Sequence, residues 1–282
     1  MVLNTVGTRL ALEALQNAPM VAAGPAPNQM PEPIIKWLQT ASWPAMGAVL
    51  LLENLVIFAL VILVGSRVAA RHSDRRVALA PDAVSKTEAI VALANVLLNT
   101  MTTMAGLFLW RRGVIVFRSD AGVFALADVL VLLLGMDLLM YLLHRTAHTR
   151  ILFALLHRFH HRYDRPRPLT LFALSPVENL AFGGLWLAFI SLYHASWVGM
   201  SVYLFLNVFF GAIGHLGVEP FPRAWARNPV LKHVAGGSFH AQHHQDREHN
   251  FGFYTLVWDR LFGTIRPDYE QNYGRLPAWI RD

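Results

Sequence analysis

Histidines recur at helical spacing in this sequence. Two stretches repeat the pattern His-x-x-His-His, with the members His157, His160 and His161 in the first stretch and His240, His243 and His244 in the second. A third stretch places His144 and His148 four residues apart. Residues three or four apart are neighbours on a helix surface, so each stretch is predicted to present its imidazoles together. Neutral imidazole binds iron, zinc, copper and nickel, and the pattern therefore predicts a metal site.

Eight clustered imidazoles exceed what one ion can use, so two metal ions are predicted. His215, which follows the last apolar segment, is the predicted ninth ligand. The complete predicted ligand set is His144, His148, His157, His160, His161, His215, His240, His243 and His244. Structural or interfacial roles are expected for His72, His194, His233 and His249, although the roles of His233 and His249 stay open. The chain contains no cysteine, so nitrogen or oxygen atoms must hold the metal.

The composition places these motifs at a membrane. Hydrophobic residues make up 55% of the 282 residues and charged residues only 15%, whereas soluble proteins carry about 25% charged residues. Disordered, collagen-like, coiled-coil and disulfide-rich secreted chains are excluded by the same composition. Five apolar segments are each long enough, as a helix, to span the hydrocarbon core: residues 45–65, 89–110, 121–143, 176–193 and 196–214.

The last two segments are predicted to form a helical hairpin. Ser175, Pro176 and Glu178 match an N-cap, a first-turn proline and the third position of a capping box, so a helix should begin at 176. Glu178 is accordingly expected to be a cap rather than a catalytic acid. Only residues 193–195 separate this helix from the next. Whether the hairpin 176–214 crosses the bilayer or re-enters stays open.

The charges favour one orientation in the membrane. Five crossings place residues 66–88, 144–175 and 215–282 on one face, and these regions carry 19 of the 24 Lys and Arg residues. By the positive-inside rule this face is cytoplasmic, and 12 of the 13 histidines lie on it. The net charge of +6 is therefore assigned to topology and anionic headgroups, and no nucleic-acid partner is expected.

The predicted architecture is an all-α membrane protein with about four to five transmembrane helices and a cytoplasmic helical cap that holds the dimetal site. Residues 1–44, which contain several prolines and no secretory signal pattern, are expected to be a leader and interfacial segment. Residues 45–282 are expected to form a single membrane domain, with the histidine motifs in a core at 128–266.

The motifs resemble those of the fatty acid hydroxylase/sterol desaturase superfamily of integral membrane non-haem di-iron oxygenases. The resemblance extends over residues 128–266 and includes flanking signatures around Asp137 and Tyr141, in Gly214–Glu219, in Asn250–Gly252 and in Trp258–Thr264. It implies two iron ions, with zinc possible in purified protein, and O2 as a co-substrate. It also implies hydroxylation of a membrane lipid such as a fatty acyl chain or a sterol, or desaturation at the same centre as the alternative.

The resemblance also implies partners and a location. Some relatives carry a fused amino-terminal cytochrome domain, which is not expected here, so electrons should come from a separate ferredoxin, flavoprotein or cytochrome-type reductase. A bacterial inner membrane is expected, with the active site facing the cytoplasm. The lipid, the carbon attacked and the oligomeric state stay open. A histidine-rich metal transporter is the rival from another class, but transport needs polar ligands at bilayer depth, whereas these motifs lie outside the spans.

Asp137 and Asn250 are the predicted catalytic residues besides the metal ligands. Asp137 precedes His144 by seven residues, about 10 Å along a helix, so it is expected to serve a ligand on another helix. Asn250 is expected to orient His244 or to hold a metal-bound water. Carboxylates near the motifs could also support ligand imidazoles, namely Glu219, Asp246, Glu248 and Asp259. Glu53 and Asp128 lie within predicted spans and are expected to pair between helices.

Overall fold

The structure, a computed structural model, describes residues 32–277 and 280. Most of the expected leader, residues 1–31, therefore lies outside the described residues. The remainder of that segment contains a short helix, α2 (Glu32–Thr40). Pro33 stands in its first turn, where a proline removes no intrahelical hydrogen bond. The part of the expected leader and interfacial segment that the structure describes thus includes a helix just before the first span.

Four long apolar helices can cross a membrane: α3 (Trp43–Arg71), α4 (Lys86–Arg111), α5 (Val123–Ala147) and α8 (Trp197–Gly214). A fifth apolar helix, α7 (Pro176–Leu192), has 17 residues and is shorter. These five helices coincide with the five predicted segments. The prediction of an all-α membrane protein with four to five spans is therefore confirmed, and the chain is an integral membrane protein.

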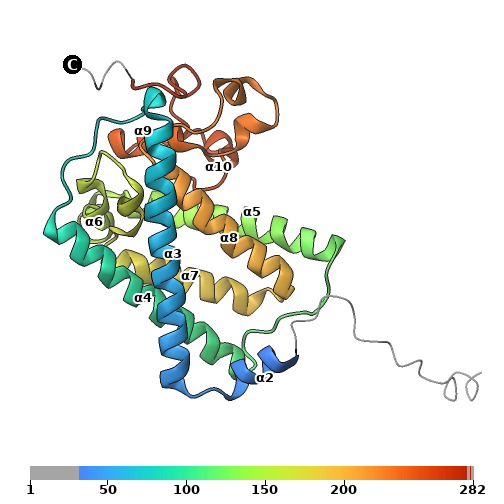
Figure 1. The fold of residues 1–282 in the computed structure, drawn as a ribbon. Coiled ribbons are helices and arrows are strands. Elements are labelled where there is room, and N and C mark those ends of the chain that lie inside the picture. The colour runs from blue at the N-terminus through green and yellow to red at the C-terminus, as the bar shows by residue number, and fades with distance from the viewer. Residues whose placement is uncertain (1–31, 278–279, 281–282) are drawn as a thin grey trace, which may run out of the picture.

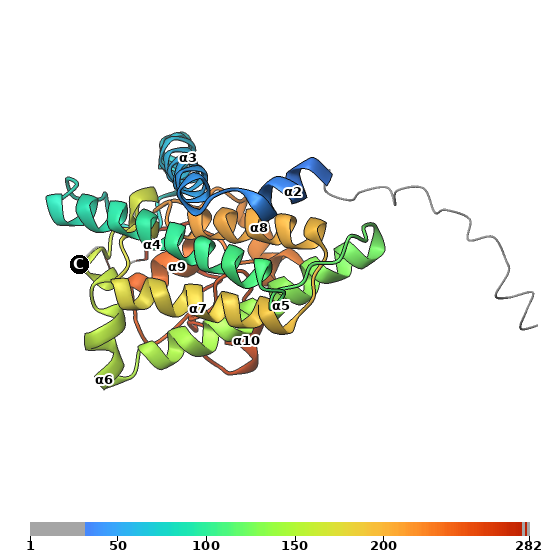
Figure 2. The ribbon, with the colours of Figure 1, turned by 90° about the horizontal axis from the view of Figure 1, so that it is seen from below.

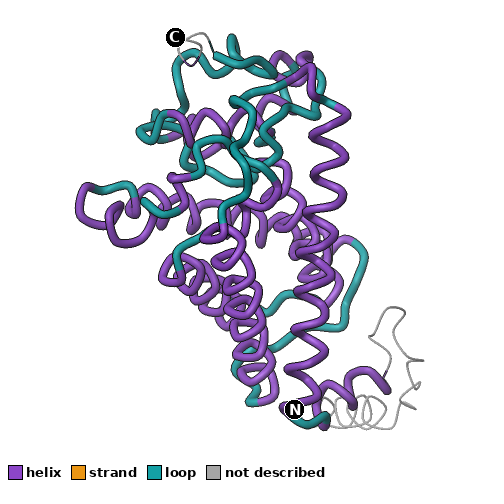
Figure 3. Tube along the Cα trace, turned by 60° about the vertical axis from the view of Figure 1, so that its left-hand side comes forward, coloured by secondary structure: helices purple, strands orange, loops and turns teal. Residues whose placement is uncertain are grey.

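The segments that follow α3, α5 and α8 gather at one end of the molecule (Figure 3). In this region the chain forms short turns rather than long helices. Its helical pieces are Ser73–Arg75, α6 (Arg150–Leu152), Phe153–His157, His160–Arg162, Pro168–Phe172, Arg223–Arg227, Leu231–His233, α9 (Gly237–Gln245) and α10 (Val257–Leu261). Figure 1 shows this cap stacked on one end of the bundle, in which α4 packs against α3 and α7. In the view from below, α5 runs alongside α7 and α8, and it packs against both (Figure 2).

Serine caps set the starting points of four apolar helices. The hydroxyl oxygens of Ser42, Ser85, Ser175 and Ser196 each accept a hydrogen bond from the backbone N–H three residues later. Such a cap satisfies one of the N–H groups that the first turn of a helix leaves without a partner. The predicted start of α7 at residue 176 is confirmed.

Asp128 ties the turn of the α7–α8 hairpin to α5. Its carboxylate accepts hydrogen bonds from the hydroxyl of Tyr193 at 2.6 Å and from the backbone N–H of Ser196 at 2.8 Å, and it pairs with Arg118 at 3.0 Å. The contact needs a glycine on α8, because a Cβ at Gly199 would lie only 2.5 Å from the Cβ of Asp128. The expected interhelical role of Asp128 is thus observed.

The outward faces of the spans are apolar. On α3, for example, Leu52, Leu60 and Leu63 are all more than half exposed, as expected where lipid replaces water. Glu53 is exposed on the same helix and pairs with no other helix within residues 32–277, which contradicts the expected interhelical role. A carboxylate at this position reaches the surface of the bundle instead of its interior.

Candidate metal centre

The nine predicted ligands come from four parts of the chain that meet where α5 ends and α7 begins. His144 lies in the last turn of α5, and His148 caps that helix. His215 is the first residue after α8. The first His-x-x-His-His motif was expected on a regular helix, but it lies in a π-helical turn (Phe153–His157) followed by a 3-10 turn (His160–Arg162). The second motif lies on α9.

The nine imidazoles form two compact groups. One contains His144, His148, His157, His161 and His243, and the other contains His160, His215, His240 and His244. Within each group, one ligand atom from every residue lies within 4.8 Å of the others. In both motifs the outer two histidines belong to one group and the middle histidine belongs to the other. Each motif therefore contributes to both groups and links them.

Hydrogen bonds fix the tautomer of several of these rings. Four Nδ1 atoms lie within 3.3 Å of a backbone carbonyl oxygen: His144 with Phe251, His160 with Ala173, His215 with Gly211 and His243 with His249. A carbonyl oxygen can only accept, so Nδ1 carries the hydrogen in each ring. The Nε2 atom of a neutral ring then presents a lone pair.

These lone pairs face one another. The Nε2 atoms of His144 and His157 are 2.9 Å apart, and those of His160 and His215 are 3.4 Å apart. Two lone pairs cannot hydrogen-bond, whereas a shared cation would bind both. A nitrogen–metal distance of about 2.1 Å with angles of about 90–109° gives a nitrogen–nitrogen separation of about 3.0–3.4 Å. The residues therefore fit metal ions, although this geometry does not distinguish iron from zinc.

Burial keeps the rings in the neutral form that binds metal. Desolvation lowers the pKa of His215 to about 4 and that of His148 to about 2, and it lowers the pKa of His240, His243 and His244 well below the usual value. At neutral pH all five are therefore uncharged. The Nε2 atom of His148 is buried without a hydrogen-bond partner, a costly arrangement that a bound ion would relieve.

Glu178 contacts a predicted ligand, which the sequence reasoning missed. Its backbone N–H binds the Ser175 hydroxyl, as expected for a cap. Its carboxylate, however, accepts a hydrogen bond from Nδ1 of His157 at 2.5 Å, so His157 also presents Nε2 to its group. Carboxylates that orient metal-binding imidazoles in this way are common. The two residues are 21 positions apart in the chain, and nothing in the sequence signalled the contact.

Asp137 contacts none of the nine histidines. Its buried carboxylate accepts hydrogen bonds from the backbone N–H groups of Phe253, Tyr254 and Thr255 and from the Thr255 hydroxyl. The expectation that it serves a ligand on another helix directly is therefore wrong. Asp137 holds a cap segment on α5, and the carbonyl of Phe251, two residues before that segment, binds His144.

Asn250 also acts on backbone groups. Its side-chain amide donates to the carbonyl of Phe239 and accepts from the N–H of Arg266, and its φ of 62° lies in the left-handed region. It does not contact His244, so the expected orienting contact is wrong. Its hydrogen bonds instead join the start of α9 to the chain that follows.

The other nearby carboxylates also bind groups other than the nine imidazoles. Glu219 accepts from the N–H groups of Phe221 and Ser238, and Asp259 accepts from those of Phe251 and Gly252. Asp246 pairs with Arg266 and His249, and Glu248 is exposed. His72, His194, His233 and His249 lie outside both groups.

Residues 129–264 match the fatty acid hydroxylase family. The part of the chain that carries the histidine motifs thus has the sequence features of this family. Its members are membrane non-haem di-iron lipid oxidoreductases, and the resemblance inferred from the histidine motifs is confirmed.

Several curated proteins that are similar to the chain act on sterols according to their names. A Delta(7)-sterol 5(6)-desaturase of Leptosphaeria maculans is 28% identical over 49% of the chain and 37% of its own length. A C-4 methylsterol oxidase of Schizosaccharomyces pombe is 30% identical over 49% of the chain and 45% of its own length, and lathosterol oxidase of Homo sapiens is 26% identical over 59% and 56%. The chain thus spans about half or less of the length of these relatives. No solved structure matches it.

Proposed function

We propose that this protein is an O2-dependent hydroxylase of a membrane lipid, with two iron ions held by the five-histidine and four-histidine groups. The observation that carries the proposal is the pair of buried groups whose neutral imidazoles face one another at the end of apolar helices. The match of residues 129–264 to the fatty acid hydroxylase family supports iron over zinc. Zinc has no redox chemistry, although it can replace iron in purified protein.

Bound iron would supply the activation of O2 and the oxidation of an unactivated C–H bond, which side-chain acid–base chemistry cannot achieve. The protein's own residues hold and orient the ligands. Nδ1–H bonds to backbone carbonyls and to Glu178 direct the Nε2 atoms inward. The rings of Phe251 and Phe253 lie 5.9 and 5.1 Å from the ring of His144, and these apolar neighbours help to exclude water from the centre.

The surroundings of the centre support a lipid substrate and a separate electron donor. Apolar helices lead from the histidine groups into the bilayer region, so a lipid can approach without leaving the membrane. The cap is basic and carries exposed arginines, among them Arg158, Arg162 and Arg247. An acidic ferredoxin, a flavoprotein or a cytochrome-type reductase would be attracted to this face. We place the face in the cytoplasm of a bacterium, with the spans in the inner membrane.

Desaturation at the same centre is the second candidate, favoured by the printed name of the Leptosphaeria maculans relative. A hydroxylase adds one oxygen atom to the lipid and a desaturase removes two hydrogen atoms, so their products differ in mass. Lipid extracts of a host that expresses the protein, compared by mass spectrometry with extracts of the same host without it, separate the two.

The hydroxylase proposal predicts an iron-dependent product about 16 mass units heavier in ordinary O2 and about 18 mass units heavier in O2 labelled with oxygen-18. A product two mass units lighter would support the desaturase instead. Metal flux into vesicles without any lipid product would contradict both and support the transporter. Two controls should lack the product: the host grown in iron-free medium, and the host that expresses the His160→Ala variant.

A further inference from the structure

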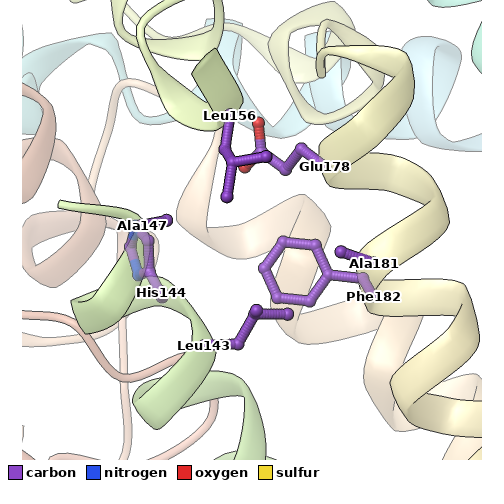
Figure 4. Close-up of a pocket in the computed structure, with 7 residues that line it drawn as sticks. All are labelled: Leu143, His144, Ala147, Leu156, Glu178, Ala181 and Phe182. Atoms are coloured by element: carbon purple, nitrogen blue, oxygen red, sulfur yellow. The ribbon is translucent and has the colours of Figure 1, made fainter. Parts of the chain in front are cut away.

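Five acidic side chains stand on the five apolar helices, all of whose residues are described. Four of them are buried and bound, as for Glu178, which points from α7 into the interior of the bundle (Figure 4). The bound pairs are Glu88 with Arg167, Asp128 with Tyr193, Asp137 with Thr255 and Glu178 with His157. Glu53 on α3 differs, because it is exposed and has no partner among the described residues.

Glu53 lies deep in the part of α3 that crosses the membrane. Trp43 at the start of α3 marks the interface, because its exposed ring lies 4.5 Å from the guanidinium of Arg111, and tryptophan is enriched at the edges of the hydrocarbon. Glu53 is ten positions further along the helix, a rise of about 15 Å, which is about half the thickness of the hydrocarbon core. At this depth its short side chain does not reach the headgroups, and lipid tails offer no hydrogen bond.

The helix that carries Glu53 is the least covered of the spans. It stands at the outside of the bundle (Figure 2) and packs mainly against α4. Of its 29 residues, only Met46, Val61 and Gly65 are buried. Most of the α3 surface is therefore open to lipid or to another protein.

One exposed stripe of α3 has the spacing of a helix–helix interface. Its members recur at alternating intervals of four and three residues, and all are exposed: Val49, Glu53, Val56, Leu60, Leu63 and Arg67. We call these six residues the α3 stripe. Such spacing places side chains along one side of a helix, where paired helices pack at a crossing angle of about 20° in membranes. Lipid covers valine and leucine as well as protein does, but it leaves Glu53 without a partner.

We propose that two copies of this chain pair in the membrane along their α3 stripes, with the two Glu53 side chains hydrogen-bonded to each other. Both copies have the same orientation in the bilayer, so a two-fold axis brings each stripe residue against its own copy. A carboxylic acid both donates and accepts a hydrogen bond, so Glu53 is complementary to itself. A different membrane protein would have to supply a matching polar group at the same depth, whereas the second copy supplies it by symmetry.

Cross-linking tests which side of α3 forms the contact. The chain contains no cysteine, so a single introduced cysteine reports only on its own position. Val56→Cys lies on the α3 stripe. Leu55→Cys is the matched control, because Leu55 is also exposed but points about 100° away around the helix axis. A disulfide needs Cα atoms within about 7 Å, so oxidation of the full chain in phosphatidylcholine vesicles should convert Val56→Cys, and not Leu55→Cys, into a covalent dimer.

Energy transfer between dyes tests the role of Glu53. Asp74, whose side chain is 76% exposed just beyond α3, gives the labelling site as Asp74→Cys. Dilution of the labelled protein with lipid yields the dissociation constant of the dimer. Glu53→Leu should raise this constant about 5- to 30-fold, the worth of a hydrogen bond between membrane helices. Glu53→Gln should stay close to the unaltered protein, because an amide also donates and accepts.

Equal cross-linking at residues 55 and 56, an unchanged dissociation constant in Glu53→Leu, or the absence of energy transfer at every protein-to-lipid ratio would overturn the proposal. So would a protein that is monomeric in vesicles but whose Val56→Cys variant cross-links to a different protein in host membranes. All variants should keep the metal content of the unaltered protein, because α3 contributes no histidine to either group. None of these measurements uses lipid oxidation, so their outcome is independent of the hydroxylase function proposed above.

Discussion

Replacement of Glu178 tests the metal centre at a residue that is not itself a ligand. Glu178 is only 4% exposed, so no water can take over its hydrogen bond to Nδ1 of His157. In Glu178→Leu the imidazole loses its orienting partner, and in Glu178→Gln the amide oxygen can still accept the Nδ1–H bond. Loss of such a partner lowers metal affinity by about 10- to 100-fold, or about 1.4–2.7 kcal/mol.

The two histidine groups make this prediction selective. His157 belongs to the five-histidine group, so Glu178→Leu should weaken one ion and leave the ion in the four-histidine group nearly unchanged. Metal content measured during titration with a competing chelator should then fall in two separate steps. In Glu178→Leu, the step of the five-histidine group should shift to a lower chelator concentration. Glu178→Gln should shift the same step by less.

Asn179→Leu provides the matched control for this experiment. Asn179 is the next residue on α7, is also buried, and donates its side-chain hydrogen bond to Asn99 rather than to a histidine. The variant should retain both chelation steps. An equal shift of both steps in Glu178→Leu, or the same shift in Asn179→Leu, would show that the effect comes from general loosening of α7 and would refute the orienting role.

Three further perturbations address the ligands and their support. His160→Ala should remove a ligand of the four-histidine group, so metal analysis should find one ion instead of two. The variant should still insert into the membrane but lose lipid turnover. Wild-type turnover in this variant would contradict the ligand assignment. Removal of the metal by a chelator should lower the temperature of thermal unfolding, because the facing lone pairs of the imidazoles then repel one another. Added iron or zinc should restore the unfolding temperature. An unchanged unfolding temperature would contradict the proposed dimetal site. Asp137→Ala should destabilise the protein by about 2–3 kcal/mol, measured by denaturant unfolding, because the backbone of residues 253–255 loses its charged acceptor; normal stability would contradict this anchoring role.

The sequence predicted the spans well because their signal is local. A bilayer imposes a minimum apolar length on a helix, and serine caps mark several of the starting points, so the ends of α7 could be placed within a residue. The histidine motifs were equally readable, because their spacing alone indicates a metal site. Both predictions depend on residues that are close together in the chain.

The supporting contacts could not be predicted because they join distant residues. Glu178 and His157 are brought together only when the turns of 153–162 fold back on α7, and Asp137 meets residues 253–255 across 116 or more positions. A carboxylate near a histidine in sequence was expected to support it, as with Asp246 and Asp259. In the structure Asp246 instead pairs with the side chains of Arg266 and His249. Asp259 accepts the backbone N–H groups of Phe251 and Gly252, because buried backbone donors in the loops of the cap need partners.

On α9, the geometry of a regular helix explains why one His-x-x-His-His motif contributes histidines to both groups. At 3.6 residues per turn, successive residues are about 100° apart around the helix axis. His244 is therefore only about 40° from His240 around the axis. His243 lies on the opposite side of His240, about 100° from His244. A regular helix thus directs His240 and His244 toward one point and His243 toward another, as the grouping requires. The pattern His-x-x-His-His on one short helix can hold ligands for two neighbouring ions, which a pair four residues apart, such as His144 and His148, cannot do.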